Sequence, residues 1–217
     1  MVKRLLLLLI ALLFFNQRGN SQSGEDVVKK YSEHFLSYNS IYAKYKFSII
    51  DKNGVEKFST PGDFYYQWGK FVINTELSDI YCDGESKIIH DKSVDEIIIL
   101  GHKEDDNNMS ENPFVVLTSS LSAYTVEGID KVNLPNAFNE ECYQITLHPK
   151  TELDHKSVAM VVGASDYSIK SIVYNSKNGG EYKVDISTIL EVETKEDAFF
   201  TLDIENLPLS TEVNDLR

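Results

Sequence analysis

Apolar and polar residues alternate over most of the chain, a period of two that is typical of β-strands burying one face. In residues 42–49, every odd position from 43 onwards is apolar or aromatic. Turn sequences such as Asn53-Gly54 separate successive segments. Strands are expected at 42–49, 55–68, 71–73, 79–82, 87–90, 97–100, 124–129, 142–147, 157–162, 167–174, 181–190 and 199–202.

Together these segments predict an α+β, mainly β, fold: one antiparallel sheet of roughly ten strands, strongly curved so that it buries one face. Pro61-Gly62 falls inside the second strand and marks an edge or a bulge, because proline cannot donate a ladder hydrogen bond. Residues 206–217 are expected to form a tail.

A first helix is expected at residues 24–38. Ser23 is a good N-cap, and Asp26 lies near the positive end of the helix dipole. Helical spacing gives this segment one apolar face, made of Val27, Val28, Tyr31, Phe35 and Leu36. Such a face needs a sheet to lie on.

A second, shorter helix is expected between Glu111 and Tyr124. Asn112 can cap it, and Pro113 suits the first helical position, where a missing N–H costs nothing. Its apolar stripe consists of Phe114, Leu117 and Leu121. A helix of about three turns is marginal in water, so this stripe requires an apolar surface. We expect that surface to be the curved sheet, where the helix would compete with a bound cargo.

The N-terminus has the pattern of a secretory signal peptide. Lys3 and Arg4 precede an unbroken apolar run, and small residues lie before a cleavage position after Ser21. The run is too short to span a bilayer. We therefore expect a signal peptide at 1–21 and a single exported domain at 22–217.

The expected mature chain is strongly acidic. Removing residues 1–21 removes three bases and no acid, so the formal charge of −13 becomes −16. This charge repels phosphate backbones and anionic head groups, which argues against nucleic acid as a partner. Cys82 and Cys142 could form a disulfide in an oxidising compartment, but the sequence does not establish their separation.

Motifs for catalysis, metals and cofactors are missing from the sequence. It contains no glycine-rich phosphate loop, no nucleophile elbow and no metalloprotease helix. The acidic stretch 102–110 lacks the ligand spacing and the turn glycine of a calcium loop, so a solvated loop is expected. His90 and Asp91 are neighbours on a strand and point to opposite faces, which favours a surface histidine. We expect neither enzyme activity nor a cofactor.

Aromatic residues are concentrated on the second expected strand, where Phe64, Tyr66 and Trp68 share one face. Periodicity alone favours an ordinary sheet core for these rings. A lining that faces lipid is the alternative.

Short stretches along the chain resemble motifs of the outer-membrane lipoprotein carrier family, the LolA-like chaperones, in the family's order. These stretches are Gly62-Asp63-Phe64-Tyr65, Cys82-Asp83-Gly84-Glu85-Ser86, Asn112-Pro113-Phe114-Val115-Val116-Leu117, Leu147-His148-Pro149-Lys150 and Glu212-Val213-Asn214-Asp215-Leu216-Arg217. They resemble the family's Gly-Asp strand opening, Ser-Asp-Gly-Lys turn, Thr-Pro-Phe helix start, Leu-x-Pro-Lys strand end and closing Val-x-Asp-x-Arg.

The resemblance implies an unclosed half-barrel whose concave face is covered by helices and binds acyl chains. The implied cavity lining is Phe64, Tyr66, Trp68 and Val72, and the implied lid is Phe114, Leu117 and Leu121. Implied partners are acylated lipoproteins, an inner-membrane lipoprotein release complex and an outer-membrane acceptor that the sequence does not identify, all in the periplasm.

One departure from the family concerns how the lid is held. The family usually carries an arginine near the end of the strand that begins at Gly62-Asp63, and this arginine hydrogen-bonds the lid shut. Trp68 falls at that place here, so the family's latch is not carried over.

Functions from other classes remain open beside transport. A half-barrel of this kind could be the lipid- or protein-sensing domain of an envelope signalling system. An envelope enzyme acting on lipid or glycan would require bonded titratable groups at the cavity mouth.

Overall fold

The computed structural model describes residues 23–103, 109, 112–118, 123–134 and 140–217. The expected signal peptide at 1–21, the helix start at Glu111 and the lid residue Leu121 lie outside the described residues. Among the described residues, no helix combines the length and apolar character needed to cross a membrane.

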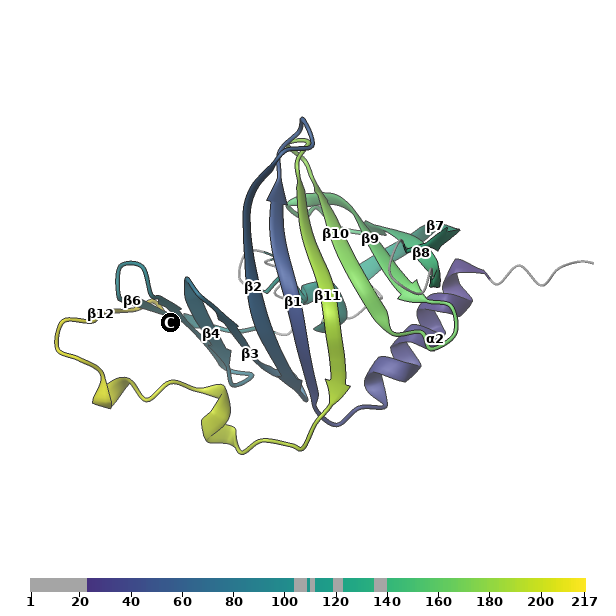
Figure 1. Ribbon diagram of the computed structural model, residues 1–217. Helices are drawn as coiled ribbons and strands as arrows, with labels where there is room; N and C mark the ends of the chain where they lie inside the picture. The colour runs from purple at the N-terminus through teal and green to yellow at the C-terminus, as the bar shows by residue number, and fades with distance from the viewer. Residues whose placement is uncertain (1–22, 104–108, 110–111, 119–122, 135–139) are drawn as a thin grey trace, which may run out of the picture.

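A single sheet of twelve strands forms the body of the protein (Figure 1). The strands are β1 (Ile41–Ile50), β2 (Glu56–Gln67), β3 (Lys70–Thr75), β4 (Ser78–Cys82), β5 (Ser86–Asp91), β6 (Glu96–Gly101), β7 (Tyr124–Asn133), β8 (Glu141–Pro149), β9 (His155–Gly163), β10 (Ile169–Ser176), β11 (Glu181–Glu191) and β12 (Glu212–Asp215). Their order is β12-β6-β5-β4-β3-β2-β1-β11-β10-β9-β8-β7, so the sheet ends at β12 and β7 and does not close. The predicted mainly β, unclosed half-barrel is confirmed.

The C-terminal part of the chain corrects two of the sequence predictions. Residues expected as a strand at 199–202 lie partly in a 3₁₀ helix, η2 (Asp197–Phe200). The expected tail contains β12, which pairs with β6 in parallel, so the sheet is not wholly antiparallel. Four residues without strong alternation carry too little pattern to reveal an edge strand, even though a turn from Pro208 to Thr211 precedes them.

The register of β2 explains the Pro61-Gly62 step. The pairing of β2 with β3 ends at Gly62 and Thr75, so Pro61 faces a partner only on the β1 side. Gly62 pairs with Tyr45, and a Cβ on Gly62 would come 2.5 Å from Cζ of the tyrosine ring. The glycine therefore leaves room for the Tyr45 ring to lie across β2.

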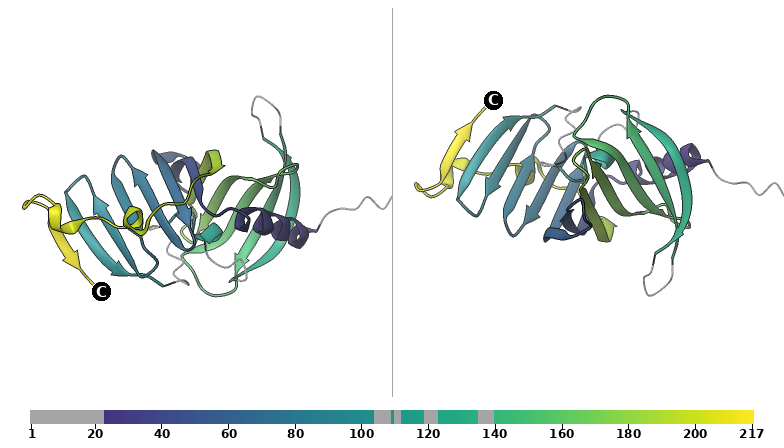
Figure 2. Two further views of the ribbon diagram at one scale, coloured as in Figure 1. Left: turned by 90° about the horizontal axis from the view of Figure 1, so that it is seen from below. Right: turned by 90° about the horizontal axis from the view of Figure 1, so that it is seen from above.

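The first helix, α2 (Gly24–Leu36), is capped as predicted. The Ser23 hydroxyl accepts from the Asp26 N–H at 3.1 Å, and the Asp26 carboxylate accepts from the Ser23 N–H. Its apolar face buries Val27, Tyr31 and Phe35 against one side of the sheet. Figure 2 shows α2 lying along the β7–β11 half of the sheet.

The second helix begins later than expected. The Asn112 side-chain oxygen accepts from the Phe114 N–H at 2.9 Å, and the Asn112 backbone carbonyl accepts from the Val115 N–H at 3.0 Å. Pro113 and Phe114 form this turn, and the helix α3 spans Val115–Thr118. Asn112 thus starts a turn before the helix, because its side chain bonds two residues ahead.

The sheet buries apolar residues on both faces. Phe64, Ile73 and Ile80 are paired across β2, β3 and β4 and therefore point to one side, hereafter the concave face, together with Tyr45 of β1. This face carries the main core, to which α2 and residues 112–117 contribute. The predicted covering of the concave face by helices is confirmed.

The C-terminal segment, residues 192–211, packs on the face opposite to the one that carries Ile80, because Ile88 neighbours the Ile89 that pairs with Ile80. The Gln67 amide donates to the Lys195 carbonyl at 3.0 Å and accepts from its N–H at 2.7 Å. Leu202, Ile204 of η3 (Ile204–Asn206) and Leu207 then pack on a second cluster formed by Ile88, Ile97 and Ile99. The segment therefore shields the outer face of the β2–β6 half before it reaches the edge as β12.

The two cysteines are not joined by a disulfide. Cys82 is buried in β4 and Cys142 is buried in β8, and six strands lie between these two in the sheet order. Burial raises the pKa of the Cys142 thiol. Both thiols therefore belong to the packed interior.

Candidate functional site: an apolar cavity on the concave face

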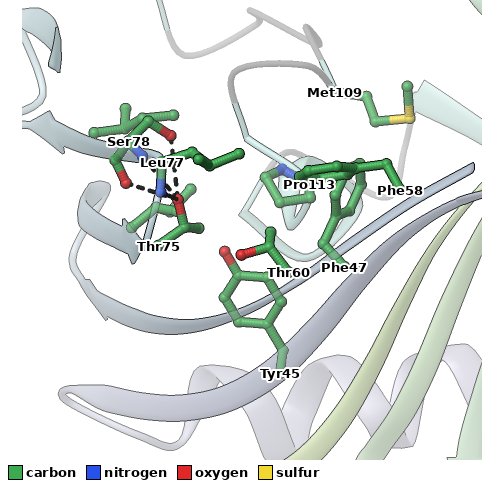
Figure 3. Close-up of a pocket in the computed structure, with 11 residues that line it drawn as sticks. Tyr45, Phe47, Phe58, Thr60, Thr75, Leu77, Ser78, Met109 and Pro113 are labelled. Atoms are coloured by element: carbon green, nitrogen blue, oxygen red, sulfur yellow. Dashed lines mark hydrogen bonds between the residues drawn. The ribbon is translucent and has the colours of Figure 1, made fainter. Parts of the chain in front are cut away.

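A cavity of about 170 Å³ opens on the concave face between the sheet and the residues Met109 and Pro113 (Figure 3). Phe47 of β1, Phe58 of β2 and Ile73 of β3 form apolar walls. Met109 and Pro113 cover it from the side of the second helical segment. The lining contains no charged side chain among the described residues. Such a cavity can hold a hydrocarbon group, and its lining provides no charged side chain to a metal ion or a phosphate.

Hydroxyl groups supply the polar part of the lining. Thr75 and Ser78 lie at the β3–β4 turn. The Thr75 hydroxyl donates to the Ser78 backbone carbonyl and accepts from the Ser78 N–H, both at 2.9 Å. The Thr60 hydroxyl donates to the Pro61 carbonyl at 3.1 Å. The Tyr45 side chain projects from β1 toward Thr60 in Figure 3. Burial, followed by the charge of Asp63, raises the pKa of Tyr45, which keeps its hydroxyl neutral.

Phe114 anchors the covering segment on the sheet. Its ring stacks on Phe64, with centroids 4.0 Å apart and planes 9° apart. It also meets Tyr45 edge to face at 4.9 Å. Phe114 is 1% exposed, and its neighbours Val115 and Val116 are equally buried. The segment therefore occupies apolar surface of the sheet that would otherwise be available to a ligand.

Tyr174 of β10 holds the same segment by hydrogen bonds. Its hydroxyl donates to the Pro113 carbonyl at 2.9 Å and accepts from the Val116 N–H at 3.3 Å. The residue is fully buried, and burial raises the pKa of its hydroxyl well above the ordinary value. A neutral hydroxyl can donate and accept together, so one side chain satisfies two backbone groups of the segment.

A histidine lies beside this tyrosine in the core. His155 is 1% exposed, its Nε2 is 3.2 Å from the Tyr124 hydroxyl, and its ring meets Tyr174 edge to face at 5.2 Å. Its Nδ1 has no hydrogen-bond partner among the described residues. Burial lowers the pKa of this imidazole. His155 and Tyr124 are not part of the cavity lining, so they do not form a catalytic group at its mouth.

The structure places only some of the sequence-predicted site residues on the concave face. Phe64 and Tyr66 lie on this face but not in the lining of the cavity, and Phe114 and Leu117 lie in the covering segment. Their roles in lipid binding stay predictions. Val72 pairs with Tyr65 and not with Phe64 or Tyr66, so it points to the opposite face. The expectation that Val72 shares their lining is wrong, because the register of the β2–β3 hairpin sets it one residue out of phase.

Trp68 also lies away from the concave lining. Strand β2 ends at Gln67, and Trp68 occupies the two-residue turn into β3 with a φ of 49°. Its side chain is 67% exposed. The expected strand face ends one residue earlier because Trp68 and Gly69 both adopt the left-handed conformation of a tight hairpin.

The wall residues Tyr45, Phe47, Phe58 and Ile73 were not among the predicted site residues. The alternation in residues 42–49 correctly groups Tyr45 with Phe47 on one side of β1, yet it does not say which side is hollow. Gly62, placed opposite Tyr45, was the available signal, since a glycine inside a strand marks a close approach. Tyr174 gave no signal, because its partner is 58 or more residues away.

The ionisable residue that the sequence singled out, His90, is paired with a carboxylate in the structure. His90 bonds through Nε2 to Asp95 at 3.1 Å and not to the adjacent Asp91. Across the described ranges, no three His, Cys, Asp or Glu side chains are placed to hold a metal ion.

The fold and the cavity define the class of the protein: an unclosed half-barrel with an apolar cavity beneath a helical cover. A scan against protein-family models finds no match, and a search of curated proteins finds none either. Solved structures, however, share the fold. The chain is similar to an uncharacterised conserved protein from Thermus thermophilus, with a TM-score of 0.55 and 9% identity over 89% of this chain and 99% of that chain.

Other similar structures include members of the family that the sequence motifs resemble. A LolA superfamily protein from Nitrosomonas europaea aligns with a TM-score of 0.46 and 12% identity, over 84% of this chain and 99% of that chain. A putative outer membrane lipoprotein-sorting protein domain from Vibrio parahaemolyticus aligns with a TM-score of 0.47 and 7% identity, over 82% and 95%. Similarity at these levels concerns the fold, so function has to be argued from the site.

Proposed function

We propose that the protein is a periplasmic carrier that binds the acyl chains of lipoproteins on its concave face and ferries them between the inner and outer membranes. The observation that carries the proposal is the apolar cavity, which is covered by a short segment and not sealed by continuous packing. The family resemblance of the sequence motifs points the same way.

The size of the cavity indicates how a ligand would bind. At about 170 Å³, the cavity is close to an engineered apolar cavity of about 150 Å³ that holds one benzene molecule. A long acyl chain needs more room than this. Residues 112–117 would therefore have to leave Phe64 and Tyr45 as the chain enters, which exposes more apolar surface to the ligand.

The covering segment would adjust affinity to the needs of a carrier. Burial of one methylene is worth about 0.8 kcal/mol, so a sixteen-carbon chain gains about 12 kcal/mol when it leaves water. A permanently open cavity with that affinity would release its cargo slowly. Because the cargo must first displace Phe114 and its neighbours, the net affinity falls by the value of those contacts. Hydrolysis of a nucleotide is not required on this protein.

The proposed partners follow from the proposed role. Acylated lipoproteins would be taken from an inner-membrane release complex and passed to an outer-membrane acceptor. The acidic surface, with a formal charge of −13 for the whole sequence, disfavours lasting adsorption to anionic lipid. Loading would therefore depend on a protein partner or on the acyl chain itself.

Release of lipoproteins from inner-membrane vesicles tests the proposal. The purified protein is incubated with vesicles that contain a release complex and a labelled lipoprotein, and the soluble fraction is assayed for a complex of the two. We expect the wild type to bring lipoprotein into solution, and Phe47→Glu, which places a charge in the half-buried cavity wall, to abolish this.

Trp68→Glu is the matched control, because it introduces the same charge at an exposed turn outside the lining. We expect this variant to behave as the wild type does. Binding of lipoprotein in detergent without release from vesicles would instead support a sensing domain of an envelope signalling system. Equal release by Phe47→Glu and wild type would contradict the proposed site.

A further inference from the structure

An unused hydroxyl donor points into the apolar cavity. Tyr45 lines the cavity and is 4% exposed, yet its hydroxyl makes no hydrogen bond within the described part of the protein. The neighbouring hydroxyls of Thr60 and Thr75 already donate to backbone carbonyls. The hydroxyl is not one of the fully enclosed, unpaired polar atoms of the described residues, so it opens on the cavity, where its donor is free to bond a ligand group.

The position of this hydroxyl is built by the local sequence. Gly62 lies directly opposite Tyr45, and any Cβ there would come within 2.6 Å of the Tyr45 hydroxyl oxygen. The Phe114 ring holds the other side of the tyrosine ring at 4.9 Å. The ring is thus confined between β2 and the covering segment, with its hydroxyl directed at the cavity.

The surroundings of the cavity are unsuited to an anion. None of the lining residues is basic. Lys92 reaches the rim but donates to the Thr75 carbonyl at 2.7 Å and pairs with Asp79 at 2.7 Å. Lys87, buried on the concave face of β5, lies outside the lining and has an interaction of its own.

We infer that the cavity selects neutral acyl esters or amides over free fatty acids, and that Tyr45 is the residue that makes the selection. This inference rests on the proposed function and names the ligand chemistry of that site. The Tyr45 hydroxyl donates a hydrogen bond to the carbonyl oxygen of the ester or amide, while the hydrocarbon fills the space beside Phe47, Phe58 and Ile73. A carboxylate in the same place would be buried without a counter-charge.

Displacement of a neutral fluorescent probe, 1-aminoanthracene, from the purified full chain at pH 8 tests the inference. Methyl octanoate, octanoate and octane are compared as competitors because they share an alkyl chain and differ in the polar end. We expect the inhibition constant of the ester to be lower than that of the carboxylate by a factor of about ten or more. Tyr45→Phe is expected to weaken the binding of the ester by about two- to tenfold, which is the range of one neutral hydrogen bond. The binding of octane should stay unchanged.

Tyr182→Phe is the matched control, since Tyr182 packs on the same core but lies outside this cavity lining. In this variant, the binding of all three competitors should be the same as in the wild type. Thermal melting checks that both variants are folded. Equal competition by ester and carboxylate in the wild type would overturn the inference, as would an unchanged ester affinity in Tyr45→Phe. Both of these outcomes leave the carrier function standing. Failure of the probe and of every competitor to bind would instead contradict the carrier function itself.

Discussion

Tyr174 holds the covering segment, residues 112–117, on the sheet by hydrogen bonds. Its hydroxyl satisfies the Pro113 carbonyl and the Val116 N–H from a strand 58 residues further along the chain. The sequence predicted that the family's arginine latch is not present at Trp68, but it could not name a replacement. Long-range hydrogen bonds leave no periodic trace, so only the fold brings Tyr174 under the segment.

Tyr174→Phe should loosen the cover while the ring packing is kept. Two buried backbone groups lose their partner, and we expect a loss of about 1–3 kcal/mol in the free energy of unfolding. Because the segment is then easier to displace, a hexadecanoyl ester should bind about three- to tenfold more tightly. Urea denaturation and fluorescence titration measure the two effects. Tyr182→Phe serves as the control, and an affinity that is unchanged in Tyr174→Phe would show that this hydroxyl does not hold the cover.

His155 should make stability depend on pH. Burial lowers its pKa below the ordinary value of about 6.5, so the folded protein keeps the ring neutral while the unfolded chain takes up a proton. The unfolded state therefore binds more protons below pH 6.5, and the free energy of unfolding must fall as the pH falls from 7 toward 5.5.

Urea denaturation at pH 7 and pH 5.5 checks this expectation. His155→Gln should lose less stability than the wild type over this interval, whereas His148→Gln, at a partly exposed histidine, should follow the wild type. A His155→Gln variant with the full wild-type loss would show that another group carries the pH dependence.

At the scale of elements, the hydrophobic pattern of the sequence predicted which helices and strands exist better than it predicted how they are placed against one another. The alternation of apolar residues located every long strand, and Ser23 with Asp26 located the start of α2. The site was harder, because a lining depends on which face of each strand is hollow. Phe64 lies on the concave face but outside the cavity lining, while Val72 lies on the opposite face, since its side depends on the register across the hairpin.

The C-terminal segment is the element that the sequence concealed most fully. Phe200 is 1% exposed on the outer face, next to Phe199, whose ring meets Tyr65 edge to face at 5.0 Å. Lys70 pairs with Asp197 in the same turn at 2.6 Å. These contacts are tertiary, so a sequence that predicted a strand at 199–202 and a tail at 206–217 did not reveal how the segment packs on the sheet.

Phe200→Ala should therefore be strongly destabilising. Removing a fully buried phenylalanine ring costs about 3–5 kcal/mol in the free energy of unfolding. Leu209→Ala is the control, because Leu209 is fully exposed in the same segment and should change stability by less than about 0.5 kcal/mol. Equal midpoints in urea for Phe200→Ala and wild type would mean that the segment adds nothing to the sheet.

At the scale of the whole molecule, the two faces of the sheet have different roles. The outer face of the β2–β6 half is packed against the C-terminal segment, which includes η2 and η3. The concave face is packed against α2 and residues 112–117 but leaves the cavity beside them. The proposed carrier role requires the outer side to stay packed while the covering segment, residues 112–117, is displaced.

Displacement of the cover by a ligand is the central claim, and amide hydrogen exchange tests it most directly. Exchange of the Val115, Val116 and Leu117 amides, which are bonded to Asn112, Tyr174 and Phe114, is measured with and without a saturating hexadecanoyl ester. Because the ester cannot fit into about 170 Å³, we predict that exchange at these amides becomes faster when it binds, while amides of β1 and β11 stay protected. Slower or unchanged exchange at all three amides in the ligand complex would contradict the account.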